Sequence, residues 1–281
     1  MDRRTVLTSS LASIALISAA APALAAPKAV LWDRWTAHDP ASEATIDHGL
    51  WAKVLERCLV TGSDGINRFA YEKAAEDRKR LDAYLEMLAA TPISDHNRPE
   101  QMAYWINLYN ALTVKVILDH YPVESIRDID ISPGLFSDGP WGKKLMTIER
   151  ETVSLDDVEH QILRPIWQDP RIHYAVNCAS IGCPNLQPTP FKPNMLDSQL
   201  DQAAIEFVNH RRGVDVRDGR ITVSSIYEWF QEDFGGNDRG VIAHLKAYAA
   251  PSLAMKLEGF DRIDNDDYDW RLNDTMGPTG S

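Results

Sequence analysis

The sequence predicts an α+β fold in which a helical N-terminal half packs on a small, mainly antiparallel sheet. Up to Tyr121 the apolar residues recur at helical spacing, whereas short segments of strand character begin only at Leu145. The chain contains no internal repeat, so a solenoid or propeller is not indicated. About 250 residues remain once a leading export signal is set aside, which suits one domain, expected over residues 46–275.

The first 25 residues have the pattern of a cleaved signal peptide. Basic residues at the start precede an apolar run over residues 6–21, and Ala23-Leu24-Ala25 provides a small-residue cleavage site. The pair Arg3-Arg4 fits a twin-arginine export signal. We therefore expect a periplasmic or secreted protein that begins with an extended leader over residues 26–45. The apolar run is shorter than the roughly 20 residues that span a bilayer.

Charge and cysteine content exclude several classes of protein. The formal net charge of −12 would repel nucleic acid and anionic lipid, and the only paired basic residues late in the chain are Arg211-Arg212. No nucleic-acid partner and no membrane span are therefore expected, and the oligomeric state is open. Three cysteines are too few for a disulfide scaffold. Cys58 follows a helical apolar pattern and is predicted to be a buried packing residue.

The helical half centres on one long apolar helix. Residues 72–90 carry one apolar stripe, as in a surface helix. Residues 101–120 are apolar on most sides, which predicts a central helix opened by Pro99. Asn107 and Asn110 interrupt that surface on adjacent turns, and each amide must either bond a neighbouring loop or take part in a binding site.

The middle of the chain alternates between strand and helix signals. Residues 145–148 and 152–153 are predicted to form a hairpin. Ser154 and Asp157 fit a capping pattern for a short helix over residues 155–164 that Pro165 would end. Residues 172–176 contain isoleucine, tyrosine and valine and are predicted to be a strand.

The last third closes the domain with helices and a hairpin. A helix is expected from about residue 196 to 210. Residues 214–217 and 220–223 alternate around Asp218-Gly219, which predicts a hairpin with a type I′ turn. A further helix ends near Tyr248, and an acidic tail follows.

The candidate chemistry lies between Glu159 and Cys178. Cys178 stands in a loop of small residues, where a thiol can act as a nucleophile. His160 is then the candidate general base, with Glu159 as its orienting carboxylate. His173 competes with His160 for the role of base, although on a regular strand it would face away from Cys178. Asn177 and the main-chain N–H groups of the following loop are candidate oxyanion donors.

Other interpretations of these residues remain open. Cys178 and Cys183 are two thiols that an oxidising compartment could join in a short disulfide. They are also candidate metal ligands together with a histidine, although the C-x4-C spacing is not typical of zinc sites. They are equally candidates for inert packing residues.

Several stretches of the chain resemble one known family. They include residues 101–112, 138–141, 154–164 and 173–184, and further on residues 226–234 and 268–273. These motifs, in this order, resemble the family called domain of unknown function 547. The resemblance implies a fold similar to the cysteine-protease and transglutaminase group, with a rearranged order because His160 precedes Cys178. It also implies that the functional positions include the following residues: Glu159, His160, His173, Asn177, Cys178, Asn107 and Asn110.

The sequence thus predicts an exported hydrolase or acyl transferase that uses Cys178 and a histidine on amide or thioester bonds, without cofactor or metal. A peptide-like or amide substrate suits an exported protein. Such chemistry places the sulfur within about 4 Å of an imidazole nitrogen. The first alternative is a binding module for a peptide or protein, with Trp141 as an aromatic contact and a structural Cys178–Cys183 pair. The second is a metal-dependent hydrolase.

Overall fold

A computed structural model describes residues 27–134 and 139–276, so the predicted signal peptide lies outside the described residues. The α-helices are α1 (Gly49–Cys58), α2 (Tyr71–Glu76), α3 (Arg78–Ala90), α4 (Arg98–His120), α5 (Arg164–Trp167), α6 (Ile172–Ala175), α7 (Leu196–Val208), α8 (Ile226–Trp229), α9 (Asp238–Tyr248) and α10 (Pro251–Leu257). The strands are β1 (Leu59–Thr61), β2 (Asn67–Phe69), β3 (Met146–Ile148), β4 (Glu151–Val153), β5 (Val214–Arg217), β6 (Arg220–Ser224) and β7 (Asn265–Asp267).

The α+β prediction is confirmed, and the strands are short. They form three separate small sheets, β1–β2, β3–β4 and β5–β6–β7, instead of one. The hairpin pairings are antiparallel, and β7 adds to β6 in parallel. The predicted type I′ turn is consistent with the positive φ angles of Asp218 and Gly219, 50° and 72°. The acidic tail was not predicted to contain a strand.

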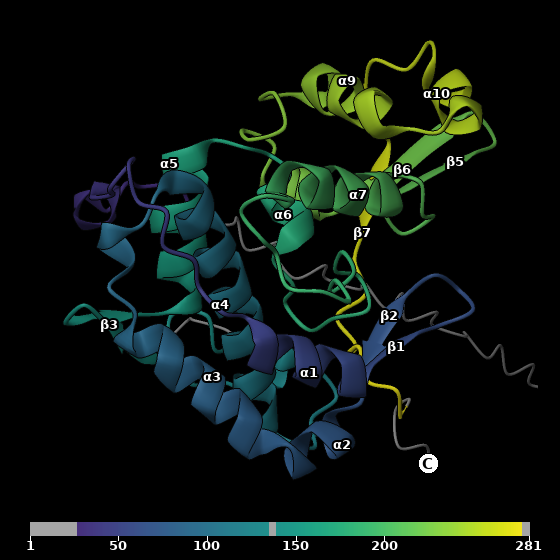
Figure 1. The fold of residues 1–281 in the computed structure, drawn as a ribbon. Helices are drawn as coiled ribbons and strands as arrows, with labels where there is room; N and C mark the ends of the chain where they lie inside the picture. The colour runs from purple at the N-terminus through teal and green to yellow at the C-terminus, as the bar shows by residue number, and fades with distance from the viewer. Residues whose placement is uncertain (1–26, 135–138, 277–281) are drawn as a thin grey trace, which may run out of the picture.

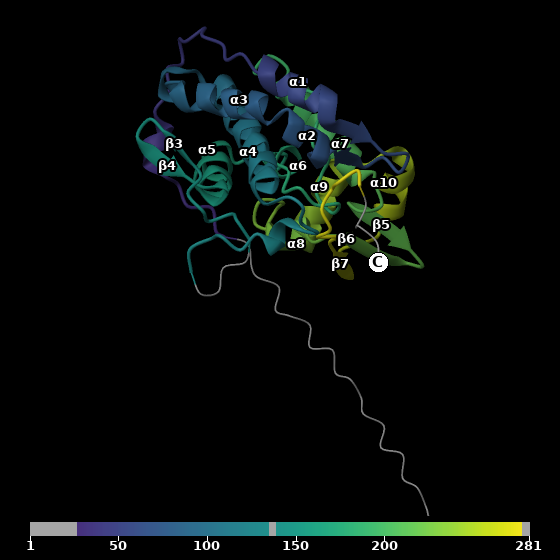
Figure 2. The same cartoon turned by 90° about the horizontal axis from the view of Figure 1, so that it is seen from below.

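Helix α4 is the centre of the structure, as its sequence predicts. The side chain of Asn97 accepts a hydrogen bond from the N–H of Glu100, and Pro99 occupies the first turn, so the helix begins where its sequence indicates. Nearly all of its residues are buried. In Figure 1 it stands among the blue and teal helices, and Figure 2 shows α1 and α3 side by side, in agreement with their close packing.

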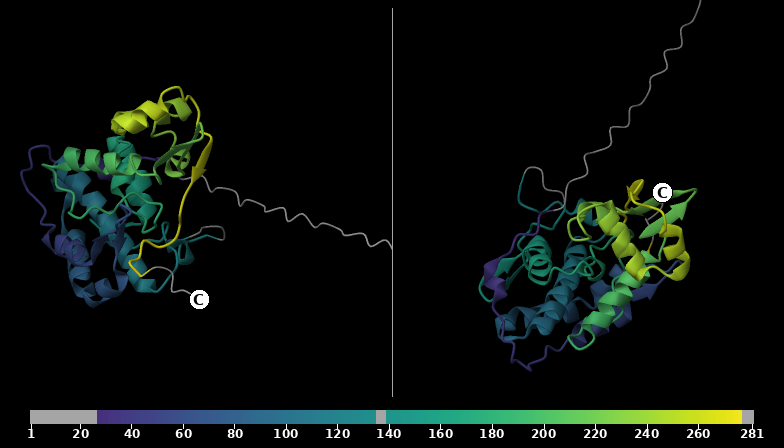
Figure 3. Two further views of the ribbon diagram at one scale, coloured as in Figure 1. Left: turned by 90° about the vertical axis from the view of Figure 1, so that its right-hand side faces the viewer. Right: turned by 90° about the horizontal axis from the view of Figure 1, so that it is seen from above.

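Two apolar cores make up the interior. The larger surrounds α4 and takes side chains from α1, α3 and the segment around Val158. The smaller lies among α7, the β5–β6 hairpin, α9 and α10. The chain after β7 runs from the second core back to the first, which Figures 1 and 3 both show as the yellow segment. This return places the C-terminal residues against the loop that carries the cysteines.

The prediction that Pro165 ends a helix is wrong. The chain is helical from Leu155 to Trp167, with a π-helical segment at Asp157–Leu163. Pro165 has no N–H to donate to the preceding turn, but the carbonyls of His160 and Gln161 accept hydrogen bonds from the leader instead. The N–H groups of Val30 and Trp32 donate these bonds at 2.9 and 3.0 Å. Backbone from the leader thus satisfies acceptors that a proline within a helix leaves open.

The prediction of a strand at residues 172–176 is also wrong, because Ile172–Ala175 is the single-turn helix α6. The side chain of Asp169 accepts a hydrogen bond from the N–H of Arg171, and the N–H of Val176 closes the turn on Ile172 at 3.1 Å. Its apolar residues pack beside α7. Burial against a helix therefore overrides the strand preference of these residues. His173 and Cys178 therefore do not lie on opposite sides of a strand, contrary to the prediction from the sequence.

The leader contacts the larger core and is not extended throughout, because Asp33–Thr36 forms a short 3₁₀ helix. Trp35 is 2% exposed and lies edge to face with Trp105 of α4, with 5.0 Å between ring centroids. Arg98 donates hydrogen bonds to the carbonyls of Trp35 and Thr36. Leu31, in contrast, is 45% exposed.

Replacing Trp35 by alanine should therefore lower the free energy of unfolding by about 3–5 kcal/mol, because it empties a filled aromatic site in the core. Urea denaturation with linear extrapolation measures this change. Leu31→Ala in the same leader is the matched control and should stay within about 0.5 kcal/mol of the parent. Equal effects of the two substitutions would show that the leader does not stabilise the domain.

Candidate functional site

A closed loop from Asn177 to Pro184 carries both candidate cysteines. The side chain of Asn177 spans it, since Nδ2 donates to the carbonyl of Pro184 at 2.7 Å and Oδ1 accepts from the N–H of Ala179 at 2.9 Å. Ala179 has a φ of 60°, in the left-handed region that residues with a Cβ rarely adopt. The Asn177 side chain thus stabilises a sharp turn directly after Cys178.

The C-terminal segment fixes the outer edge of this loop. The N–H groups of Ile181 and Gly182 donate to the carbonyls of Arg271 and Asp269, both at 2.8 Å. The N–H of Asn273 donates to the carbonyl of Ala179 at 3.0 Å. The N–H groups of Ala179, Ile181 and Gly182 are therefore all used inside the protein and are not free to serve as the predicted oxyanion donors.

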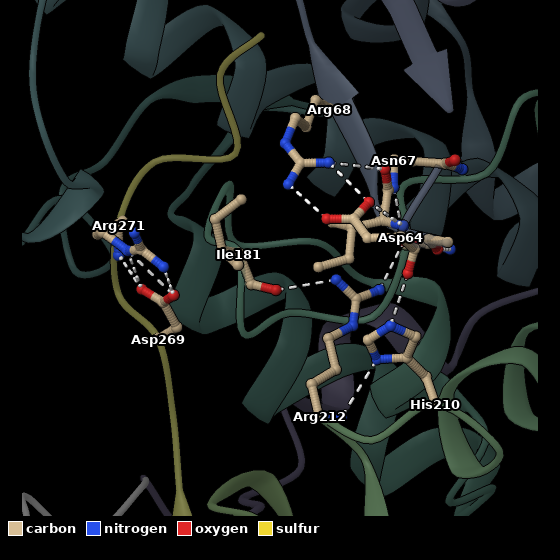
Figure 4. A network of polar contacts seen from close by, with 11 residues as sticks. Asp64, Asn67, Arg68, Ile181, His210, Arg212, Asp269 and Arg271 are labelled. Carbon is tan, nitrogen blue, oxygen red and sulfur yellow. Dashed lines mark hydrogen bonds and ion pairs between the residues drawn. The ribbon is translucent and has the colours of Figure 1, made fainter. Parts of the chain in front are cut away.

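Arg212 also bonds the cysteine loop. Figure 4 shows its guanidinium pointing at the carbonyl of Ile181, to which it donates at 2.8 Å. The same group donates to the side chain of Asn185 at 2.6 Å. His210, close by in the same view, bonds the carbonyl of Asp64 at 2.9 Å. The loop is thus tied to residues before β5, to the β1–β2 connection and to the C-terminal segment.

Three side chains surround the sulfur of Cys178. Its Sγ lies 3.1 Å from Sγ of Cys183, 3.0 Å from the hydroxyl of Tyr268 and 3.4 Å from Oγ of Ser180. Ser180 in turn donates to the hydroxyl of Tyr268 at 2.9 Å. Cys178 is partly exposed, whereas Cys183 and Cys58 are buried. All three cysteines are free thiols.

This environment favours the thiolate of Cys178. The hydrogen bond with Cys183 is the strongest influence and lowers the pKa of Cys178, and the bonds with Ser180 and Tyr268 act in the same direction. Burial and the charge of Glu159 oppose them, but the pKa remains lowered. Burial raises the pKa of Cys183 well above its usual value. Burial also raises the pKa of Tyr268, which therefore keeps its proton as a donor.

A second group of buried polar side chains surrounds His173. Its Nε2 is 2.7 Å from Oδ2 of Asp233, and its Nδ1 is 3.7 Å from Oε1 of Glu159, beyond hydrogen-bond distance. Arg164 donates to the two carboxylate oxygens of Asp233 at 2.6 and 3.2 Å. The ring of Phe230 stacks on His173 with 4.1 Å between centroids. Two carboxylates and two basic side chains thus share one apolar enclosure.

The charged residues in this group shift one another's pKa values. Burial alone would lower the pKa of His173, but Asp233 and Glu159 raise it above its usual value. Burial alone would raise the pKa of Glu159, but His160 and His173 lower it to about 2. The pKa of Asp233 is likewise held well below its usual range, against the effect of burial, by His173 and Arg164. The two carboxylates therefore favour the protonated form of His173, which makes it a weaker candidate for a general base.

His160 has partners of its own. Burial lowers its pKa, and the charge of Glu159 opposes this effect. Arg164 donates to Nδ1 at 3.1 Å, and Nε2 lies 3.7 Å from Oδ1 of Asp156. Burial, followed by the charges of Glu159 and Asp157, raises the pKa of Asp156 to about 6. The Nδ1 lone pair of His160 is thus already engaged.

The structure does not bring the predicted thiol and histidines into direct contact. The hydrogen-bonding partners of the Cys178 sulfur within the described residues are Cys183, Ser180 and Tyr268, and neither His160 nor His173 is among them. Glu159 nonetheless acts electrostatically on Cys178. The thiol and the charged group are therefore neighbours without a direct hydrogen bond between them.

Asn107 and Asn110 bond loop backbone with both ends of their amides. Asn107 Nδ2 donates to the carbonyl of Phe191 at 2.9 Å, and Oδ1 accepts from the N–H of the same residue at 3.0 Å. Asn110 Nδ2 donates to the carbonyl of Ala175 at 2.9 Å, and Oδ1 accepts from the N–H of Asn177 at 2.8 Å. In this structure the two amides position the loops around the site.

Trp141 reaches the site through other aromatic rings. It lies edge to face with Trp270 at 5.8 Å, and Trp270 is stacked on Trp229 at 5.5 Å. Tyr268 contacts Trp229 and Trp270, with ring centroids 4.8 and 4.6 Å away. These four aromatic residues, which we call the aromatic cluster, are partly buried and adjoin the thiol through the hydroxyl of Tyr268.

The sequence did not single out Tyr268, Ser180, Asp233 or Arg164 as site residues. Tyr268 and Asp233 do lie within the family-like stretches near the C-terminus. Their positions in the sequence do not indicate, however, that they contact residues from the middle of the chain. Among the residues described, histidine, cysteine and carboxylate side chains form no group of three suited to a metal ion. Of the helices in those ranges, none has the length and apolar character to cross a membrane.

Comparison with known proteins supports the family resemblance for part of the chain. Residues 93–208 match the family model described as "Protein of unknown function, DUF547". This stretch contains α4, the π-helical segment, α6, the cysteine loop and α7. No curated protein and no solved structure matches the chain. The match supports the domain family, and the C-terminal residues Asp233 and Tyr268 lie outside the matched stretch.

Asp233→Asn should destabilise the protein by about 3–5 kcal/mol, because it leaves the buried guanidinium of Arg164 without its carboxylate. The effect should depend on pH. The depressed pKa of Asp233 contributes stability above about pH 4 that is lost in more acidic solution, and the raised pKa of His173 contributes stability below about pH 6.5 that is lost as pH rises through the folded pKa.

The stability difference between the parent and Asp233→Asn should therefore be largest between about pH 4 and 6.5. Thermal unfolding followed by circular dichroism from about pH 3 to pH 8, on both sides of this range, measures it. Asp264→Asn is a control that removes a carboxylate hydrogen bond to the N–H of Ile221 without touching this group. A difference that does not vary with pH would contradict the arrangement of charges described here.

Tyr268→Phe should raise the apparent pKa of Cys178 by about one unit, because a hydrogen bond to a charged group contributes about 1.5–3 kcal/mol. The pH dependence of iodoacetamide alkylation, followed by peptide mass spectrometry, measures that pKa. Tyr121→Phe is the matched control, since the Tyr121 hydroxyl donates to Asp274 at 2.7 Å and does not contact the thiol. An unchanged midpoint in Tyr268→Phe would remove Tyr268 from the site.

Proposed function

We propose that the protein is an exported thiol hydrolase or acyl transferase that acts on amide or thioester bonds, with Cys178 as the nucleophile. The observation that supports this proposal is the environment of the thiol: Cys178 is partly exposed and its pKa is lowered by bonded neighbours. The thiolate is the reactive form of cysteine. The proposal includes export by the signal predicted in residues 1–25. It also includes a peptide-like or amide substrate.

The surrounding residues have distinct roles in this reaction. Cys178 attacks the carbonyl carbon, an acyl thioester forms on its sulfur, and an amine or thiol leaves with a proton. Tyr268, whose raised pKa keeps the hydroxyl protonated, supplies the nearest hydrogen-bond donor. Water or a second nucleophile then attacks the thioester and releases Cys178. Because Asp233 and Glu159 favour the protonated form of His173, and because Arg164 donates to Nδ1 of His160, the two histidines and Glu159 act through charge and positioning in this proposal.

Trapping the acyl intermediate tests the proposal. The mature protein is incubated with a panel of thioesters and peptide amides, quenched in acid and digested, and the acyl group is located by mass spectrometry. An acyl group on Cys178 is expected, with at least about a hundredfold loss of turnover in Cys178→Ser. Cys58→Ala removes a buried thiol with a raised pKa and should retain activity. Turnover that survives in Cys178→Ser would overturn the proposal.

A second candidate function is binding without catalysis, which the aromatic cluster favours. Partly buried tryptophans that adjoin one another are typical of peptide and protein contact sites. In that case Cys178 and Cys183 are structural, Trp141 contacts the partner, and Cys178→Ser leaves affinity unchanged. Retained binding of a substrate-like peptide together with no acyl intermediate in the parent would favour this candidate.

A further inference from the structure

Cys178 and Cys183 are close enough to react with each other. Their sulfurs are 3.1 Å apart, and a disulfide bond requires about 2.05 Å, so a movement of roughly 1 Å joins them. The N–H of Cys178 also donates to Sγ of Cys183 at 3.0 Å. Asn177, Ala179 and the C-terminal segment hold this geometry with main-chain and amide hydrogen bonds. The two thiols are therefore kept adjacent while both are reduced.

The two thiols differ in the way that thiol–disulfide exchange requires. Cys178 is the partly exposed cysteine of the pair, whereas Cys183 is buried at 4% exposed and has Cys178 as its neighbouring thiol. Hydrogen bonds lower the pKa of Cys178, and burial raises that of Cys183. An accessible thiolate beside a shielded thiol is the arrangement of an attacking and a resolving cysteine.

We propose that Cys178 and Cys183 form a thiol–disulfide exchange pair that reduces a disulfide in an exported peptide or protein. The Cys178 thiolate attacks one sulfur of the substrate disulfide, which forms a mixed disulfide and releases the other sulfur as a thiol. Cys183 then loses its proton and attacks the Cys178 sulfur. The products are the Cys178–Cys183 disulfide and two substrate thiols, so the two electrons that leave the cysteine pair are those that reduce the substrate.

This activity differs from acyl transfer in the atom attacked and in its need for Cys183. It shares with the proposed function the partial exposure and the lowered pKa of Cys178. The aromatic cluster beside that sulfur offers apolar contact area for a peptide chain that carries the disulfide. Oxidation of the pair would also remove the nucleophile that acyl transfer uses, so the two activities exclude each other on one molecule.

The test uses the reduced mature protein and oxidised glutathione as the probe. After an acid quench, peptide mass spectrometry should show that the parent has lost two hydrogen atoms as a Cys178–Cys183 disulfide and carries little glutathione. Cys183→Ala should retain one glutathionyl group on Cys178, at a level at least about tenfold above the parent, because the neighbouring thiol that resolves it is gone. Cys178→Ala should not react, and Cys58→Ala should match the parent.

Two outcomes would overturn the proposal: equal accumulation of the mixed disulfide in the parent and in Cys183→Ala, or a parent that gains no internal disulfide. Equilibration of the unaltered parent with glutathione redox buffers gives the same answer without any substitution, because the Cys178–Cys183 disulfide should appear at one defined ratio of oxidised to reduced glutathione. Acylation by a thioester is followed in parallel on the reduced, unaltered parent. A parent that is acylated but gains no internal disulfide, or one that gains the disulfide but is not acylated, tells which of the two proposals fails.

Discussion

The return of the C-terminal segment to the cysteine loop is the contact on which the site depends. Main-chain bonds from Ile181, Gly182 and Asn273 join two stretches that are about ninety residues apart in the chain, and they fix the loop before any side chain is considered. The same segment brings Tyr268 to the sulfur of Cys178. A chain truncated before this segment would lose Tyr268, one of the three residues whose hydrogen bonds lower the pKa of the thiol.

The charged group around His173 has a different role from the one its residue types suggest. Glutamate, histidine and cysteine near one another indicate a catalytic triad, but here two carboxylates and two basic groups balance each other in an apolar enclosure. Pairing of this kind offsets the large cost of burying each charge singly. This charged group joins the π-helical segment to Asp233. Its role is therefore to hold these parts of the structure together near the thiol, and not to supply the thiol with a base.

The sequence predicted elements whose signals are local and missed those that depend on tertiary contacts. Helix α4 and the hairpin around Asp218-Gly219 follow from apolar period and turn chemistry. α6 did not, because its isoleucine, tyrosine and valine indicate a strand until burial against α7 is known. The helix through Pro165 depends on backbone donors from the leader. For the site, the sequence singled out Cys178, Glu159 and the two histidines as candidates, but not Asp233 or Tyr268, which are distant in the chain.

The neighbours of Cys178 determine how readily its thiol ionises. The two carboxylates favour the protonated form of His173, and Nδ1 of His160 already accepts from Arg164. Burial raises the pKa of Tyr268. Within the described residues, the side chains that hydrogen-bond the sulfur are a thiol and two hydroxyls. Hydroxyl and thiol donors stabilise the thiolate, but they do not remove the proton from the thiol. The reactivity of Cys178 should therefore follow the pKa of its thiol, whichever electrophile it attacks.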